Sequence, residues 1–176
     1  AEQKIYNTVQ IPALRRNQTG TLTNANKYLT LPTDFLYVYS LAVLDGDGAY
    51  TYLLNKDVNF LREAYPNPAT TGVPVHYALF SDESIILGPT PNSGYTAELH
   101  YGYYPPSIVT ASTTWLGNEF DSALLNGALV EAVRFMKGEV DVVSNYEKLY
   151  QQAIILLKNL GDGKLREDAY RSGQYR

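Results

Sequence analysis

The chain offers few side chains that could do chemistry, and its two histidines are the first to consider. His76 and His100 both lie in stretches that alternate like β-strands. His100 follows Glu98 by two residues, so both side chains project from one face of the expected strand and could form a histidine–carboxylate pair. A general base also needs a nucleophile or a substrate pocket within reach, and the sequence points to neither. A hydrolase that uses His100 and Glu98 is therefore kept only as an alternative.

The sequence lacks the common motifs of catalysis and cofactor binding. It contains no G-x-S-x-G nucleophile motif, no H-E-x-x-H zinc motif and no glycine-rich phosphate loop. With zero cysteines, it has no disulfide scaffold, no thiolate zinc site and no cysteine nucleophile. We therefore expect a protein that is not an enzyme and that uses no metal or other cofactor.

The run DGDG at residues 45–48 resembles the start of a calcium-binding loop. The resemblance ends at the fifth and twelfth loop positions, which would be Ala49 and Lys56. A calcium loop needs an oxygen ligand and a bidentate glutamate there. Because Asp and Gly both tolerate turn conformations, a hairpin turn is the better interpretation.

Two arginines, Arg15 and Arg16, begin a polar stretch that ends at Gly20. Their guanidinium groups could contact a phosphate or an acidic neighbour. The plainer interpretation, which we adopt, is that residues 15–20 form a solvated connection between elements.

The elements that must carry these residues are mostly short strands. Apolar and polar side chains alternate over residues 36–44 and 95–103, as is typical of antiparallel strands with one buried face. The DGDG turn predicts that residues 49–54 return as a partner strand, while residues 75–80 and 84–87 form a second hairpin. In the first strand, one face is expected to hold Tyr37, Tyr39, Leu41 and Val43.

Two short helices are also expected. Ile5 and Val9 lie four residues apart before Pro12, which predicts a helix within residues 1–11. A second short helix over residues 57–65 has Asn55 or Asp57 as its N-cap.

Two longer helices are predicted near the C-terminal end. Asn118 is the expected N-cap of the first, which ends at Gly138, and the second ends at Gly161. Their short connection makes them antiparallel neighbours. The apolar stripe of the first is expected at Leu125, Ala128, Leu129, Ala132, Val133 and Met136. The stripe of the second is expected at Val142, Tyr146, Leu149, Tyr150, Ala153, Leu157 and Leu160.

The two stripes decide which residues of the helix pair we expect inside and outside. Leu149 and Ala153 are expected to be core positions, because both lie on the second stripe. Arg134 and Glu147 lie off the stripes, which makes them candidates for contacts between subunits.

These patterns predict an α+β protein. A central antiparallel β-rich part over about residues 20–110, either a small sandwich or barrel-like, packs with the C-terminal helix pair. With helical parts at residues 1–11 and 118–161, residues 1–161 form one domain, and residues 162–176 form an extended tail.

Composition sets further limits on the function. With 176 residues, 45% hydrophobic and 18% charged, the chain can bury a core of its own. A net charge of −4 argues against a broad basic surface for gripping DNA. The apolar run at residues 154–157 is far shorter than a bilayer span, so we expect no membrane contact. The 16 tyrosines favour strands and also surfaces where proteins meet.

The polar tail is predicted to dock onto a partner. Alone it buries too little apolar surface to offset the entropy of ordering. Its aromatic and aliphatic side chains could fill pockets of a partner while its arginines pair with carboxylates. The residues assigned to this contact are Leu165, Arg166, Tyr170, Arg171, Tyr175 and Arg176.

The order of these segments resembles the adaptor, or head-to-tail connector, proteins of short-tailed, podovirus-like bacteriophages. The resemblance spans nearly the whole chain, up to the two final helices. The segments that carry it are Ile5-Tyr6, Leu31-Pro32-Thr33-Asp34-Phe35, Gly72-Val73-Pro74-Val75-His76-Tyr77, Leu87-Gly88-Pro89-Thr90-Pro91 and Leu99-His100-Tyr101-Gly102-Tyr103-Tyr104-Pro105.

The resemblance implies a structural virion protein at the head-to-tail interface, made in the host cytoplasm. Such adaptors form a ring, commonly of twelve copies, beneath the portal protein and receive the tail or nozzle protein on the other side. They continue the DNA channel, so they touch the genome transiently during its retention and ejection. In similar proteins the C-terminal segment reaches along the portal.

One further alternative comes from the tyrosine-rich strands. Tyrosine rings can stack on sugars, as in a carbohydrate-binding or tail-fibre-like β module. The two C-terminal helices and the polar tail argue against this alternative.

Overall fold

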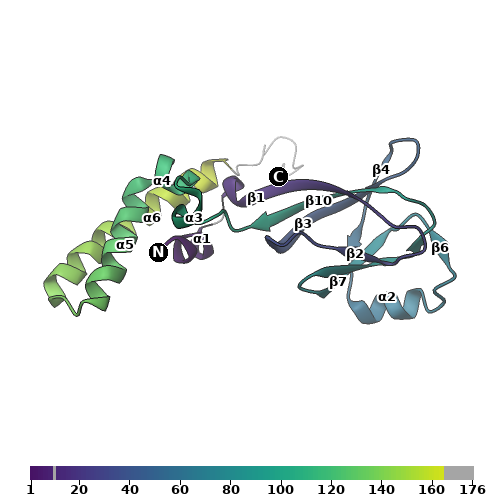
Figure 1. Cartoon of the computed structure of the whole chain (residues 1–176), viewed down its shortest axis with the longest axis horizontal. Coiled ribbons are helices and arrows are strands. Elements are labelled where there is room, and N and C mark those ends of the chain that lie inside the picture. The colour runs from purple at the N-terminus through teal and green to yellow at the C-terminus, as the bar shows by residue number, and fades with distance from the viewer. Residues whose placement is uncertain (10, 165–176) are drawn as a thin grey trace, which may run out of the picture. The chain divides into compact units, whose positions relative to one another are not determined.

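The computed structural model describes residues 1–9 and 11–164, and the chain divides into two compact units (Figure 1). The helical unit consists of residues 1–14 together with the chain from Tyr104 onward, and the strand unit spans Arg15–Tyr103. The predicted α+β class with antiparallel sheets is confirmed.

Each unit has its own set of elements. The helical unit contains α1 (Glu2–Thr8), the 3₁₀ helix η1 (Pro12–Leu14), α3 (Ile108–Ala111), α4 (Trp115–Glu119), α5 (Asp121–Phe135) and α6 (Val140–Lys164). The strand unit contains β1 (Arg15–Thr21), β2 (Tyr28–Thr30), β3 (Phe35–Leu44), β4 (Tyr50–Tyr52), β5 (Leu54–Asn55), α2 (Val58–Ala64), β6 (Thr71–Gly72), β7 (His76–Ser81), β8 (Ser84–Gly88), β9 (Thr90–Pro91) and β10 (Thr96–Tyr103).

The strand unit is built from two four-stranded sheets that share one core. Sheet A has the order β1-β10-β3-β4 and sheet B the order β2-β8-β7-β5, while β6 and β9 pair separately. Leu41 and Leu99 of sheet A lie in the same buried cluster as Tyr77 and Ile85 of sheet B. Of the two alternatives expected, a small sandwich or a barrel-like part, the two sheets match the sandwich, and the described strands form no closed barrel.

The hairpin turn at residues 45–48 is confirmed. Asp45 Oδ1 accepts hydrogen bonds from the backbone N–H groups of Asp47 and Ala49, at 3.0 and 2.9 Å. Gly48 has a φ of +80°, which glycine adopts without strain. The short helix α2 is also confirmed, and Asp57 is its cap, because its side chain accepts from the N–H of Asn59.

The predicted polar connection at residues 15–20 is wrong, because this segment is strand β1. It pairs antiparallel with β10 over its whole length, from Arg15 opposite Gly102 to Thr21 opposite Thr96. Most of its side chains are exposed, so the sequence carries no alternation of apolar and polar residues. Backbone hydrogen bonds to β10 define the strand instead.

One face of β3 also differs from the prediction. The register between β3 and β10 shifts after the pair His100–Ser40, so that Tyr101 lies opposite Val38 and leaves Tyr39 as an extra residue. Such a bulge changes which side chains point inward. As a result Leu41 packs in the core, whereas Tyr39 lies against the ring of His100.

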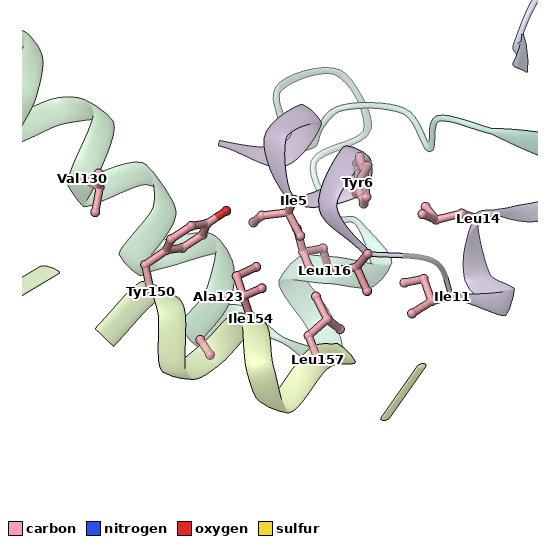
Figure 2. Close-up of a cluster of buried hydrophobic side chains, with 12 residues drawn as sticks. Ile5, Tyr6, Ile11, Leu14, Leu116, Ala123, Val130, Tyr150, Ile154 and Leu157 are labelled. Carbon is pink, nitrogen blue, oxygen red and sulfur yellow. The ribbon is translucent and has the colours of Figure 1, made fainter. Parts of the chain in front are cut away.

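The helical unit has a separate hydrophobic core (Figure 2). Ile5 and Tyr6 come from α1 and Leu116 from α4, while Tyr150 and Leu157 come from α6. α5 and α6 are joined by a short connection and pack along each other as a hairpin, as predicted. Segments that are far apart in the sequence thus meet in this core.

The termini of the two long helices differ from the prediction. Asn118 is not an N-cap, since it lies inside α4, whose cap is Thr114. α5 begins after Phe120, which makes no side-chain cap hydrogen bond. α6 does not end at Gly161 but runs on to Lys164, and Gly161 is a buried residue inside the helix.

The buried face of α5 is not the predicted stripe. Its buried residues are Ala123, Gly127 and Val130, whereas Leu125 and Met136 of the predicted stripe are 60% and 69% exposed. In α6, Ala153 is buried as predicted, but Leu149 is 41% exposed and so is not a core position. The small residues on the buried side allow α5 to approach its neighbours closely.

No helix within the described residues is both long and apolar enough to cross a bilayer.

Candidate functional site

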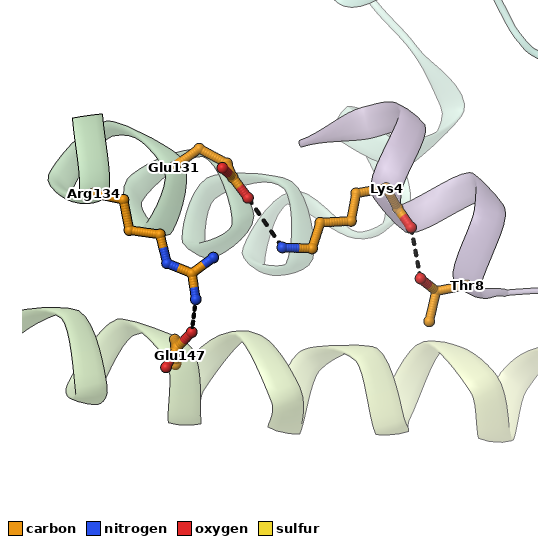
Figure 3. Close-up of polar contacts among 5 residues, drawn as sticks. All are labelled: Lys4, Thr8, Glu131, Arg134 and Glu147. Carbon is orange, nitrogen blue, oxygen red and sulfur yellow. Dashed lines mark hydrogen bonds and ion pairs between the residues drawn. The ribbon is translucent and has the colours of Figure 1, made fainter.

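The structure brings the two predicted subunit-contact residues together within one chain. Arg134 on α5 donates to Glu147 Oε1 on α6 (Figure 3). Both side chains are close to half exposed, so the pair lies at the surface of the hairpin and remains within reach of a neighbouring molecule. A contact of Arg134 and Glu147 with other subunits stays a prediction.

A second ion pair ties α1 to α5. Lys4 Nζ lies 3.0 Å from Glu131 Oε1, and the hydroxyl of Thr8 donates to the carbonyl oxygen of Lys4 (Figure 3). The hydrogen bond from Lys4, with its positive charge, lowers the pKa of Glu131 below its ordinary value. Lys4 also lies over the ring of Tyr150, at 5.9 Å from its centroid. Sequence analysis missed Lys4, because its partners are more than a hundred residues away in the chain.

The segment assigned to partner docking begins where the described part of the chain ends. Its residues are Leu165, Arg166, Tyr170, Arg171, Tyr175 and Arg176, and all of them lie outside the described residues. The structure describes the helix that leads to them, α6, up to Lys164. The docking role of these six residues therefore stays a prediction.

Glu98 and His100, the pair considered for general-base chemistry, both line one hollow on sheet A. Glu98 accepts two hydrogen bonds of 2.9 Å, one from Asn17 Nδ2 and one from the hydroxyl of Tyr50. The bond to Glu98 raises the pKa of the Tyr50 hydroxyl. A hollow of about 290 Å³ lies beside them. It is lined by Asn17, Ser40, Ala42, Tyr52, Glu98 and His100.

His100 and Glu98 share this hollow, but they do not form the histidine–carboxylate pair. The two carboxylate oxygens of Glu98 are taken by Asn17 and Tyr50, and the imidazole of His100 is stacked on Tyr39 at 5.2 Å between centroids. Within the described residues, no hydrogen bond joins His100 to Glu98. The carboxylate of Glu98 therefore does not orient or activate the imidazole of His100 as a general base.

The remaining histidine and the two arginines are held by neighbouring side chains. His76 Nδ1 lies 2.9 Å from the hydroxyl of Tyr65. The guanidinium of Arg15 lies 4.1 Å from the ring centroid of Tyr39. Arg16 makes an ion pair of 2.5 Å with Asp34. Each group thus has a structural partner within its own unit.

Acidic residues do not gather into a metal site in the described part of the chain. Among residues 1–9 and 11–164, the structure holds no group of three or more His, Asp or Glu side chains arranged for a metal ion. Asp45 uses its carboxylate to fix the 45–48 turn instead.

Comparison with known protein families gives a match that covers both units. The family model described as SU10 adaptor protein matches residues 1–175. No match is found among curated proteins.

Proposed function

Because the chain belongs to the SU10 adaptor protein family, whose members are structural adaptors of phages, we propose that it forms a ring between the portal and the tail or nozzle of a virion. The observation that carries the proposal is the family match, which extends from residue 1 to residue 175. The resemblance to head-to-tail adaptors implies a ring of about twelve copies, which one repeated contact between neighbouring copies would close. Its channel would continue that of the portal for genome retention and ejection.

Two properties of the chain suit this role. The polar clusters of the described residues are held by internal partners rather than poised for catalysis, as the bonds of Glu98 illustrate. A net charge of −4 also suits a channel that DNA must pass, since basic contacts to phosphate are the main source of non-specific affinity.

We assign the contact with the portal to residues 165–176. The arginines of this segment can form paired hydrogen bonds with carboxylates, and its tyrosines can fill pockets on the partner. Because α6 extends to Lys164, a truncation after Lys164 removes this segment and leaves the described elements complete.

The test compares the full chain with the chain truncated after Lys164. Each is mixed with purified portal protein, and the complexes are separated by sedimentation and viewed by negative-stain electron microscopy. The full chain should add a ring below the portal, while the truncated chain should keep its circular dichroism spectrum and bind the portal much more weakly. Equal binding of both chains would remove the docking role from this segment. Absence of any ring with the full chain would contradict the proposed function itself.

The hollow on sheet A favours a second candidate function, a carbohydrate-binding module. Tyr52 is 67% exposed beside the amide of Asn17 and the carboxylate of Glu98, a combination that can stack on a sugar and bond its hydroxyls. Titration with surface glycans of the host, followed by tyrosine fluorescence, tests this candidate. A response that the Tyr52→Ala variant loses would support it, and no response to any glycan would exclude it.

A further inference from the structure

The outward side of α5 is a continuous apolar face. Along α5 and its C-cap, large exposed apolar side chains flank two exposed alanines at helical spacing, on the side opposite the buried Ala123, Gly127 and Val130. We call this surface the α5 face. It consists of Leu125, Ala128, Ala132, Phe135 and Met136.

Between Leu125 and Met136, the charged side chains of α5 lie off the α5 face. Between Leu125 and Met136 the sequence has two charged residues, Glu131 and Arg134. Both are engaged within the chain, Glu131 with Lys4 and Arg134 with Glu147 (Figure 3). Asp121, in the first turn of α5, lies on the same side of the helix, so a partner meets no unpaired charge of α5 only over the stretch from Leu125 to Met136.

α6 carries two parallel rows of residues at heptad spacing. One row includes Tyr150, Ile154 and Leu157, which are buried in the core of the helical unit (Figure 2). The second row, which we call the α6 row, lies beside it with alternating steps of four and three residues. It consists of Val142, Tyr146, Leu149, Ala153, Leu156 and Leu160.

The α6 row is apolar throughout and partly exposed. Val142 and Leu149 are each 41% exposed and Leu156 is 64% exposed, whereas Ala153 of the same row is buried and Tyr146 packs against the core of the helical unit. Spacing of this kind places knobs of one helix into holes of another. The exposed leucines of the row can therefore act as knobs in a helix–helix contact that the described residues do not make.

The two surfaces complement each other in size. The middle of the α5 face is formed by the small residues Ala128 and Ala132, whereas the α6 row presents Leu149 and Leu156. The same combination already occurs inside the chain, where the small Gly127 of α5 lies against the ring of Tyr150 on α6. A second pair of α5 and α6 surfaces can thus pack as the first pair does.

We propose that the α5 face of one copy packs against the α6 row of a second copy. This inference deepens the self-assembly part of the proposed function and rests on it. A second copy is the occupant that the hairpin favours, because each chain carries one surface of each kind and a neighbour on either side covers both. Contacts between two different surfaces of identical chains are heterologous, and such contacts close into rings when the rotation permits.

The proposal is tested with one variant on each surface. Ala132→Glu blocks the α5 face and Leu156→Glu blocks the α6 row, and since both positions are exposed each variant should keep the wild-type circular dichroism and melting temperature. Each should associate with itself roughly a hundredfold more weakly than wild type, because a carboxylate would be buried in the contact without a partner. Gln151→Glu, at an exposed polar position of α6, is the matched control and should assemble normally.

Mixing the two variants distinguishes a heterologous contact from a symmetric one. The intact α6 row of Ala132→Glu can meet the intact α5 face of Leu156→Glu, so the mixture should form dimers that grow no further, as measured by analytical ultracentrifugation. Larger assemblies of either variant alone would overturn the proposal, as would a mixture that stays monomeric while wild type assembles. A wild-type chain that stays monomeric both alone and with the portal would contradict the ring itself. If wild type forms rings and both variants form them too, the contact between the α5 face and the α6 row is wrong, while the proposed ring stands.

Discussion

At the end of α5, Lys137 has a left-handed backbone conformation, with a φ of +55°. The N–H of Lys137 bonds to the carbonyl of Arg134, and the N–H of Gly138 bonds to that of Val133, which is the hydrogen-bond pattern of a Schellman motif. Glycine usually occupies the left-handed position, and here it stands one residue later. The strain of this helix end therefore lies at Lys137.

Glycine at position 137 should stabilise the protein. In Lys137→Gly, relief of the left-handed strain exceeds the added entropy of the unfolded chain, for a net gain of roughly 0.5–1 kcal/mol. Gly138→Ala should have the opposite effect, because its new methyl group would lie 2.4 Å from Val133 Cγ1. We expect that variant to lose about 1–3 kcal/mol. Urea unfolding measures both changes, and a neutral Gly138→Ala would show that the turn relaxes at no cost.

The ion pair between Lys4 and Glu131 should give a pH-dependent contribution to stability. Because the pKa of Glu131 is lowered in the folded state, the contribution is complete above the unfolded-state pKa of about 4.3 and disappears as the pH falls through the lowered value. Both side chains are about half exposed, so Glu131→Gln should cost only ~0.2–1 kcal/mol at pH 7.

Two measurements check this ion pair. The difference in unfolding free energy between wild type and Glu131→Gln should shrink toward zero in acid and should also decrease at high salt. A difference that stays the same from pH 7 to pH 3 would mean that the substitution disturbs packing rather than removing a charge interaction.

At the scale of elements, a strand could be predicted from the sequence where one of its faces is buried and the other is exposed. β10 has one buried and one exposed face, so its alternation of Ala97, Leu99 and Tyr101 with polar residues is visible in the sequence. β1 leaves most of its side chains exposed and is defined by its backbone pairing, which leaves no trace in side-chain type. A strand such as β1 can be recognised only once the strand that it pairs with is known.

The face of α5 could not be predicted because both of its sides are apolar. Hydrophobicity alone favours the side with Leu125 and Met136, whereas the core is formed by the smaller Ala123, Gly127 and Val130. Close approach to Tyr150 selects the small residues for the inside. The expected site residues Arg134 and Glu147 were recognised as surface residues, but their pairing depends on the register of the two helices.

Exchanging the charges of Arg134 and Glu147 separates their two roles. In the double variant Arg134→Glu/Glu147→Arg the ion pair is restored with reversed polarity, so its stability should match wild type within about 0.5 kcal/mol, while each single reversal should cost up to about 1 kcal/mol. If these residues also contact neighbouring subunits, the double variant should fold normally but assemble more weakly. Sedimentation of the double variant, once its stability is shown to equal that of wild type, measures this assembly. Normal assembly would show that Arg134 and Glu147 pair only within the hairpin and do not contact neighbouring subunits.

At the scale of the whole molecule, the chain leaves the helical unit after Leu14 and returns to it at Tyr104. The strand unit between them starts and ends on neighbouring strands, since Arg15 pairs with Gly102 across β1 and β10. The buried clusters of the two units share no residue. The strand unit is therefore inserted between two segments of the helical unit.

This arrangement predicts that each unit folds without the other. A fragment of residues 15–103 should unfold cooperatively in urea, because it retains both sheets and is longer than the roughly 40 residues below which single domains rarely fold unaided. Since antiparallel partners lie about 5 Å apart, a Gly-Ser linker of about four residues could replace the strand unit between Leu14 and Tyr104. The resulting chain should keep the helical circular dichroism signal and the core around Ile5 and Leu157. Loss of cooperative unfolding in the strand fragment, together with a single transition in the intact chain, would show instead that the sheets need the helical unit to stay folded.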